Sequence, residues 1–167
     1  PGGTGDTKAA ANYASSLIAG KKAHEKGYSQ VLWLDGLRHE NIEEVGSMNM
    51  FFVVNGELIT PELNGSILPG ITRDSILKIA HRMGIGAVER TIGIGEIFRA
   101  HDEGRLDEAF GTGTAAVVSA VGEMAWNGRT ITINNGEIGR YSQLFYDRLT
   151  GIQMGREEDE FGWVVRV

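Results

Sequence analysis

Hydrophobic and polar positions follow two kinds of spacing along the chain, one typical of helices and one typical of strands. Helical spacing and composition predict helices over residues 12–26, 76–83 (with a start signal at 72–75), 96–109 (with a break near Gly104) and 141–152. Apolar runs between turn residues predict strands over residues 31–34, 48–54, 57–60, 88–92, 115–121, 123–126 and 130–133, and residues 163–167 are also strand-like. Asn55-Gly56 and Asn127-Gly128 predict type I′ hairpin turns. Hairpins mixed with helices indicate an α+β domain with a mixed sheet.

Composition and charge exclude several classes of function. The chain has 167 residues, of which 41% are hydrophobic and 23% are charged, and this fits one globular domain with a substantial core. The formal net charge is −6 and no basic cluster occurs, so we expect no nucleic-acid partner. No apolar run approaches the roughly 18 residues of a membrane helix. The absence of cysteine excludes disulfides and thiolate zinc sites, and it fits a cytoplasmic protein.

The glycine content and the first residues point to a ligand-binding fragment. The chain has 24 glycines but only 3 prolines, which predicts turns with positive φ and backbone brought close to a ligand rather than a flexible linker. It opens with Pro-Gly-Gly-Thr-Gly, without an initiator methionine, a signal peptide or a transit peptide. A domain that begins in a glycine loop is expected to be part of a longer protein.

Two glycine-containing stretches are candidate anion sites. Residues 68–73, Leu-Pro-Gly-Ile-Thr-Arg, lead into a predicted helix, where free backbone N–H groups and the positive end of the helix dipole favour phosphate. Residues 111–115, Gly-Thr-Gly-Thr-Ala, offer hydroxyl and N–H donors, but no Gly-Lys-Ser/Thr of a Walker loop follows. For each stretch alone, an ordinary turn that binds nothing is the more common outcome.

Two ionisable side chains are candidates for chemistry. Lys8 lies between the first glycine loop and an alanine-rich segment, and burial there would lower its pKa and make the amine a nucleophile. A solvated lysine near a chain end is the better interpretation of that stretch alone. Glu44 precedes an apolar strand and is either carried into the interior or left at the rim. No metal site is predicted, because the histidines are scattered at positions 24, 39, 81 and 101 and are interpreted as surface or core-edge residues.

The order of the motifs is more specific than any one of them. The chain carries, in sequence, Lys8-Ala-Ala-Ala-Asn12-Tyr13, Gln30-Val-Leu-Trp-Leu-Asp35, Glu44-Val-Gly-Ser-Met-Asn49, Thr60-Pro61, Leu63-Asn-Gly-Ser-Ile-Leu-Pro-Gly-Ile-Thr-Arg73, Glu89-Arg90, Phe110-Gly-Thr-Gly-Thr-Ala115 and Ile152-Gln-Met-Gly-Arg156. This series resembles the branched-chain aminotransferases from Gly2 to the last residues, in the family's order and at its spacings.

The resemblance implies a role for individual residues. Lys8 matches the lysine that binds the aldehyde of pyridoxal 5'-phosphate covalently and then carries the proton. Glu44 matches the carboxylate that pairs with the pyridine nitrogen, where a negative charge keeps that nitrogen protonated. Tyr13 matches the tyrosine that hydrogen-bonds the phenolic oxygen of the cofactor. The remaining matches are phosphate donors at Ile71, Thr72 and Thr114, and groups that orient the substrate carboxylate at Ser47 and Ala115.

The resemblance also implies a fold, an activity and partners. The expected fold is the large domain of the D-amino acid aminotransferase-like (fold-type IV) class, with a largely antiparallel, barrel-like sheet flanked by helices. The expected activity is transamination of leucine, isoleucine and valine with 2-oxoglutarate by a homodimer whose ligands are amino acids and 2-oxo acids. Residues 1–167 would be the C-terminal cofactor-binding domain. The family's N-terminal domain, which supplies a phosphate-binding arginine and much of the substrate pocket, is expected to be absent from this chain, so the active site is expected to be incomplete.

Other interpretations stay open. A D-amino acid aminotransferase or an aminodeoxychorismate lyase shares the lysine and the glutamate, but not residues 44–49 together with residues 68–73. A non-catalytic domain fragment is the alternative outside enzymes, although Lys8, Tyr13 and Glu44 are all present. Ala116 and Ser119 stand where the mammalian enzymes carry a Cys-x-x-Cys pair, so no thiol switch is predicted.

Overall fold

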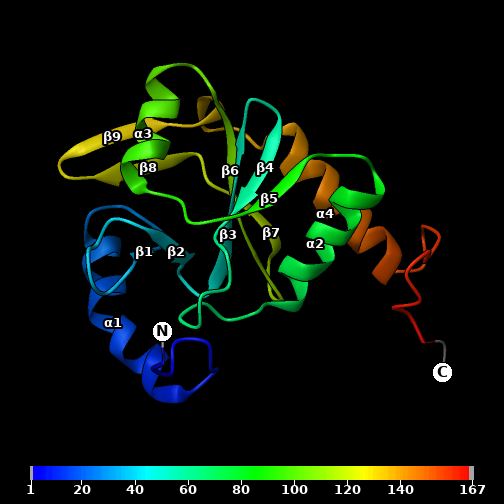
Figure 1. Ribbon diagram of the computed structural model, residues 1–167, viewed down its shortest axis with the longest axis horizontal. Coiled ribbons are helices and arrows are strands. Elements are labelled where there is room, and N and C mark those ends of the chain that lie inside the picture. Colours follow the sequence, from blue (N-terminus) through cyan, green and yellow to red (C-terminus); the bar gives the residue numbers. More distant parts are fainter. Residues whose placement is uncertain (1, 166–167) are drawn as a thin grey trace.

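The computed structural model describes residues 2–165 as a mixed α+β domain (Figure 1). Its helices are α1 (Ala10–Glu25), α2 (Ile71–Arg82), α3 (Ile94–Asp102) and α4 (Arg140–Gln153), with a 3-10 turn at Asn134–Gly136. Its strands are β1 (Leu32–Leu34), β2 (Ile42–Val45), β3 (Met48–Val54), β4 (Glu57–Thr60), β5 (Ala87–Glu89), β6 (Leu106–Gly113), β7 (Val117–Ala120), β8 (Glu123–Trp126) and β9 (Arg129–Thr132). No helix in the described range is long and apolar enough to span a bilayer.

Strand β3 is the centre of a seven-stranded sheet. One edge of β3 pairs with β2 near its start and with β4 near its end, and the other edge pairs with β6 along most of its length. β1 extends the sheet beyond β2, β7 extends it beyond β6, and β5 pairs with β4. Only the β4–β5 pair is parallel among the described strands. The hairpin β8–β9 forms a separate two-stranded sheet. This confirms the expected mixed, largely antiparallel architecture flanked by helices.

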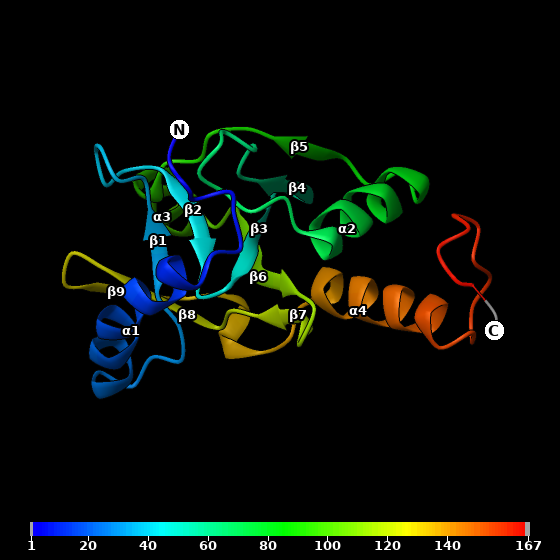
Figure 2. The ribbon, with the colours of Figure 1, turned by 90° about the horizontal axis from the view of Figure 1, so that it is seen from below.

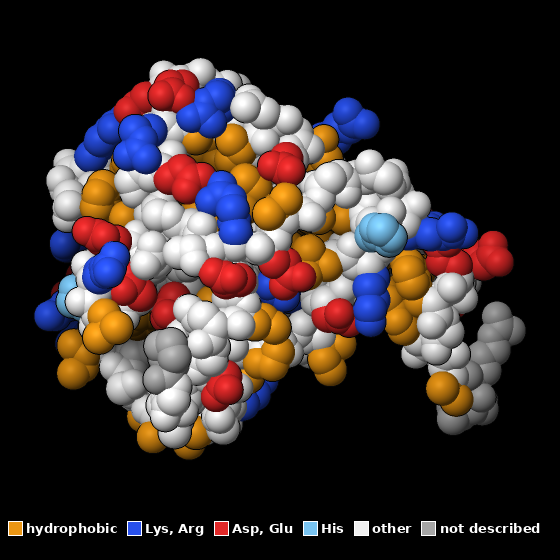
Figure 3. All heavy atoms as spheres, in the orientation of Figure 1, with side chains coloured by type: hydrophobic (Ala, Val, Ile, Leu, Met, Phe, Trp, Pro, Cys, Tyr) orange, Lys and Arg blue, Asp and Glu red, His pale blue; other side chains and the backbone are white. Residues whose placement is uncertain are grey.

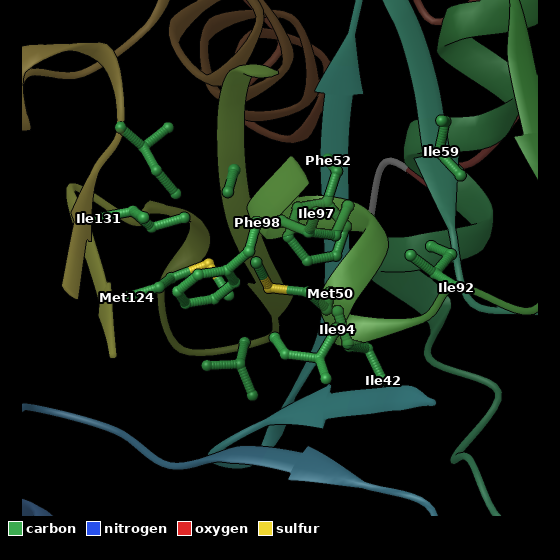
Figure 4. Packing of buried hydrophobic residues seen from close by; sticks show 13 residues of the cluster. Ile42, Met50, Phe52, Ile59, Ile92, Ile94, Ile97, Phe98, Met124 and Ile131 are labelled. Carbon is green, nitrogen blue, oxygen red and sulfur yellow. The ribbon is translucent and has the colours of Figure 1, made fainter. Parts of the chain in front are cut away.

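The alternation of side chains along β3 divides the core into two clusters, because successive residues of a strand point to opposite faces. Met50 and Phe52 belong to one cluster, which is covered by α3 and the β8–β9 hairpin (Figure 4). Phe51 and Val53 belong to the other, which is covered by α2 and α4. In Figure 2 these two helices lie beside each other at one end of the molecule, while α1 lies at the opposite end. Each of these four β3 side chains is completely buried.

Most of the predicted elements are confirmed, with small shifts at their ends. Both Asn-Gly turns are present, and positive φ values at both turn residues (51° and 76° at Asn55-Gly56, 49° and 75° at Asn127-Gly128) fit the type I′ geometry. Helix α2 begins at Ile71, directly after Gly70, and not at residues 72–75. Strand β5 ends at Glu89, earlier than the predicted residue 92.

Three predictions from the sequence are wrong. The helix predicted over residues 96–109 ends at Asp102, and residues 106–113 form β6 instead. The predicted break near Gly104 is confirmed, because this glycine takes a positive φ of 66° that stops the helix. Pairing with β3 outweighs the helix propensity of residues 106–109. Residues 163–165 form no strand, and residues 166–167 lie outside the described range. The strand predicted at 115–121 is shorter and only half-buried, as β7. Residues 42–45 were not predicted as a strand. Glu44 precedes the apolar strand β3, as expected, but it also lies on a strand of its own, β2.

Candidate functional site

A row of paired residues crosses one face of the sheet. Trp33 on β1 is the partner of Glu44 on β2, which is the partner of Asn49 on β3, which is the partner of Thr112 on β6. Because cross-strand partners point to the same face, these four side chains share the face that carries Phe51 and the helices α2 and α4. Helix α2 begins close to the first residues of β3, where this row lies. Asn49 contacts the segment that leads into the helix.

A cavity of about 380 Å³ lies over the β1–β2 end of this row. Three of the predicted site residues, Tyr13, Glu44 and Ser47, line it together with Trp33. The other lining residues come from the N-terminal loop, α1, β1, β2 and the loop before α2: Gly5, Thr7, Asn12, Ser15, Ser16, Leu34, Gly36, Glu43, Gly46, Ser66 and Leu68. The structure therefore brings together predicted site residues that are up to 34 positions apart in the sequence, from Tyr13 to Ser47.

The electrostatics of Glu44 are unusual for a carboxylate. Burial raises the pKa of Glu44 from its ordinary 4.5 to about 7, a backbone hydrogen bond from Leu68 opposes the rise, and the charge of Glu43 adds to it. Glu44 Oε1 accepts a hydrogen bond of 3.3 Å from Asn49 Nδ2. In the described residues no cation forms an ion pair with this carboxylate, so its negative charge is poorly compensated. A cationic ligand group in the cavity would stabilise that charge.

The start of α2 has the properties of an anion site. Gly70 is the N-cap residue, and no side chain caps the helix. The first backbone N–H groups of a helix, here those of Ile71 and Thr72, have no acceptor within the helix. Ile71 is 84% exposed, so its backbone lies at the surface rather than in the core.

Asn49 ties this helix start to Glu44, and sequence reasoning assigned it no role. Its Nδ2 donates a 2.8 Å hydrogen bond to the Leu68 carbonyl oxygen, and a methyl group on Gly70 would overlap its Oδ1. Asn49 is the last residue of the block Glu44-Val-Gly-Ser-Met-Asn49. Its place in that block is the feature of the sequence that could have indicated a role.

The turn between β6 and β7 adds hydroxyl groups beside the row. Thr114 and Ala115 are exposed in this turn. Thr112 is 1% exposed, and its hydroxyl has no hydrogen-bond partner among the described residues. A buried polar group without a partner is rare in folded proteins. Thr112 is the strand partner of Asn49, and Asn49 contacts the segment before α2, so the turn and this segment are connected through these two residues. The cavity over Glu44 is not lined by the other predicted site residues of the two segments, which are Ile71, Thr72, Thr114 and Ala115.

Lys8 lies in the loop that closes one side of this cavity. Asn12 holds the loop, since its Nδ2 donates to the carbonyl oxygens of Thr4 (2.6 Å) and Thr7 (2.9 Å). Gly5 packs so closely on the backbone of Ser66 that a methyl group there would overlap it. Gly5 and Thr7 line the cavity, whereas Lys8 is exposed and does not line it.

The other candidates for chemistry are accounted for. His24, His39 and His81 are exposed and His101 is half-buried, as expected, and the described residues hold no cluster of side chains suited to a metal. A larger cavity of about 820 Å³ contains none of the predicted site residues. It lies on the opposite face of the β1–β2 ribbon, because Leu32 and Val45 line it while their neighbours Trp33 and Glu44 line the smaller one. The smaller cavity is the one with a perturbed carboxylate, so we consider it the functional site.

These groups suit pyridoxal phosphate. Glu44 is a poorly compensated carboxylate for a protonated ring nitrogen, and the start of α2 offers backbone donors for a phosphate. The partnerless hydroxyl of Thr112 is a further polar group beside them.

Comparisons with known proteins show the family to which the chain belongs. Residues 5–124 match the family described as Amino-transferase class IV. Branched-chain-amino-acid aminotransferase 2 of Bacillus subtilis (strain 168) is 58% identical over 166 residues, which are 99% of this chain and 46% of that relative. A branched-chain-amino-acid aminotransferase of Mycolicibacterium smegmatis is 43% identical over 171 residues, with 100% and 46% coverage. The chain thus spans about half the length of these curated relatives.

Solved structures share the fold. The branched-chain amino acid aminotransferase of Escherichia coli superposes with a TM-score of 0.84 at 33% identity, covering 99% of this chain and 52% of that one. The T.th. enzyme, complexed with N-(5'-phosphopyridoxyl)-L-glutamate, gives a TM-score of 0.82 at 28% identity, covering 98% and 51%. These relatives confirm the resemblance found in the sequence. Since the family match extends over most of the chain, the protein belongs to the class IV aminotransferases.

Proposed function

We propose that residues 1–167 are the C-terminal, cofactor-binding domain of a pyridoxal-phosphate-dependent branched-chain-amino-acid transaminase. The observation that carries the proposal is the half-buried Glu44 carboxylate, with its raised pKa, in a cavity shared with Tyr13 and linked through Asn49 to the start of α2. The relatives that match along the whole chain support the reaction class. The rest of the active site and a cytoplasmic homodimer are expectations from the resemblance.

Each candidate residue has a distinct task in this proposal. When bound, pyridoxal phosphate delocalises the electron pair left at the Cα of the amino acid. Glu44 would hold a proton on the ring nitrogen, and the Tyr13 hydroxyl would donate to the ring oxygen. The Lys8 amine would bind the cofactor covalently and would be released when the substrate amino group takes its place on the same carbon. The freed amine would then take the proton from the substrate Cα.

The remaining residues would bind anionic groups. The backbone N–H groups of Ile71 and Thr72, with the hydroxyl of Thr114, would hold the phosphate at the positive end of α2. Ser47 and Ala115 would orient the substrate carboxylate. Leucine, isoleucine and valine are the proposed amino donors, and 2-oxoglutarate is the proposed acceptor. The phosphopyridoxyl-glutamate bound to the T.th. enzyme supports the acceptor, because glutamate is the amino form of 2-oxoglutarate.

Supplying the remainder of a relative tests this function. A chimera would join the part of the Bacillus subtilis relative that this chain does not match to Pro1 of this chain. We expect amino transfer from L-leucine, L-isoleucine and L-valine to 2-oxoglutarate, measured as glutamate formation. Lys8→Ala should abolish the activity, while Lys21→Ala, at an exposed lysine of α1, should preserve it.

Two results would count against the proposal. Transfer from D-alanine in place of the L-amino acids would favour a D-amino acid aminotransferase. A folded chimera that binds the cofactor without transferring amino groups would indicate a non-catalytic domain.

A further inference from the structure

Asn49 occupies the point at which the candidate ring and phosphate sites meet. It is 5% exposed and lies at the start of β3, with Glu44 and Thr112 as its strand partners on either side. Its amide reaches two separate segments, Glu44 on β2 and Leu68 in the loop before α2. A buried amide that links two segments in this way is more than a strand-pairing residue.

The hydrogen-bond chemistry fixes the orientation of this amide. The Leu68 carbonyl oxygen can only accept, so the amide atom 2.8 Å from it is the nitrogen of Asn49. The NH₂ group has a second hydrogen, and it is directed to Glu44 Oε1 at 3.3 Å. The amide oxygen then faces Gly70, where a side-chain methyl group would overlap it. Both donors of the amide and the space beside its oxygen are therefore used.

Leu68 closes the connection from the other side. Its backbone hydrogen bond to Glu44 is one of the influences on that carboxylate, and its carbonyl oxygen accepts from Asn49. Asn49 thus links Glu44 to the Leu68 carbonyl oxygen, two residues before Gly70, the N-cap of α2.

We propose that Asn49 is a positioning residue that fixes Glu44 relative to the start of α2, so that the ring-nitrogen and phosphate contacts of one cofactor are set by a single amide. The inference rests on the proposed function for the identity of the cofactor. The contacts themselves lie within this chain, so the coupling between Glu44 and the start of α2 can be measured without cofactor.

The other charged and titratable groups near Glu44 could also affect its titration midpoint. Glu43 is adjacent on β2, and Tyr13 faces the same cavity from α1. Neither contacts Asn49 by a hydrogen bond in the described residues. A change at Asn49 therefore reaches Glu44 through the amide contact and not through a change in these neighbours.

The first test replaces Asn49 by leucine, which has a similar size but no polar atoms. We expect the midpoint of Glu44, followed by carboxyl ¹³C NMR of the cofactor-free chain and assigned with Glu44→Gln, to rise by about one pH unit because the carboxylate loses a donor. Binding of inorganic phosphate, followed at the Ile71 and Thr72 amides, should weaken about tenfold, the effect of one lost hydrogen bond.

Thr60→Val is the matched control. The Thr60 hydroxyl is also buried and also donates to a backbone carbonyl, that of Met50 at 2.7 Å, but it contacts neither Glu44 nor Leu68. This variant should lose stability and leave both the midpoint and the phosphate affinity unchanged. If Thr60→Val shifts both as much as Asn49→Leu, or if Asn49→Leu shifts neither, Asn49 is not a positioning residue.

Gly70→Ala tests the same coupling from the helix and does not depend on the folding of the leucine variant. The new methyl group would displace the Asn49 amide, and we expect the Glu44 midpoint to rise although Gly70 does not touch Glu44. Gly93→Ala is the control, because Gly93 is the N-cap of α3 and a methyl group there meets only the Glu40 carbonyl oxygen, at 4.0 Å. An unchanged Glu44 midpoint in Gly70→Ala would overturn the proposal. These readouts need no pyridoxal phosphate, so a failure of the proposed function would leave them intact.

Discussion

Glu44 is the residue in which the chemistry of this chain is concentrated. Its pKa is raised to about 7, chiefly by burial, although it lies on a short strand at the side of the sheet. The acidic side chain was recognised in the sequence from its block, but its burial follows from β2, a strand that the local pattern did not predict. Residues 42–45, Ile-Glu-Glu-Val, lack the alternation expected of a strand because both glutamates are polar. Such departures from local pattern are expected at functional sites.

The raised pKa predicts how stability depends on pH. The folded chain binds a proton at Glu44 up to about pH 7, whereas the unfolded chain releases it near pH 4.5, so the free energy of unfolding falls as pH rises between these values. After allowance for solvent screening, we expect a loss of ~2 kcal/mol. Glu44→Gln should remove this loss, and Glu123→Gln, at an exposed carboxylate, should retain it. Urea unfolding of the cofactor-free chain at pH 5 and pH 8 measures the difference. Equal losses in the wild type and in Glu44→Gln would refute the assignment.

Helix α4 illustrates how elements far apart in the sequence stabilise each other. It begins at Arg140 without a capping side chain of its own. Glu108 on β6 supplies the cap, because its carboxylate accepts hydrogen bonds from Tyr141 N (2.7 Å), Ser142 N (2.9 Å) and Ser142 Oγ (2.8 Å). Glu108 is 5% exposed, and a methyl group on Gly139 would overlap it. The helix itself was predictable from its spacing, but a cap from a strand that is 33 residues away was not.

This cap can be tested by removing its charge. Glu108→Gln keeps the shape of the side chain but places an NH₂ group against N–H donors, so we expect a loss of ~2–4 kcal/mol in the free energy of unfolding. Asp107→Asn is the control, since Asp107 accepts a single hydrogen bond, from Gly56 N at 2.8 Å in an exposed turn. It should cost under ~1 kcal/mol. Comparable urea midpoints for the two variants would mean that Glu108 does not stabilise α4.

The two ends of the molecule differ in how closely their helices pack against the sheet. Figure 3 shows hydrophobic side chains at the surface of the lower left, where Figure 1 places α1. Helices α2 and α4 cover the sheet closely, whereas α1 has no fully buried residue and leaves Leu17 and Ile18 each 70% exposed. Exposed apolar residues that gather on one surface often mark a contact with another protein segment. The loop that carries Lys8 lies at this loosely packed end, and Asn12 is its main tether. Lys8 is exposed outside the cavity, and it lies in a segment that makes few buried contacts.

The hairpins, three of the four helices and the α+β class could be predicted from the sequence, because these follow from local spacing and turn chemistry. Strands β2 and β6 could not, since their pairing is decided by β3. The site residues came from the order of the motifs, and the cross-strand row that joins Glu44 to Asn49 and Thr112 required the register of the sheet.

Reductive trapping tests the central claim most directly. The chain is incubated with pyridoxal phosphate, reduced with borohydride, and examined by intact mass and peptide mapping. We predict that the label lies preferentially on Lys8, that inorganic phosphate in excess lowers it, and that Lys8→Ala removes it while Lys21→Ala does not. A label spread equally over exposed lysines such as Lys21 and Lys26, and unchanged by phosphate or by Lys8→Ala, would contradict the claim that this cavity binds the cofactor through Lys8.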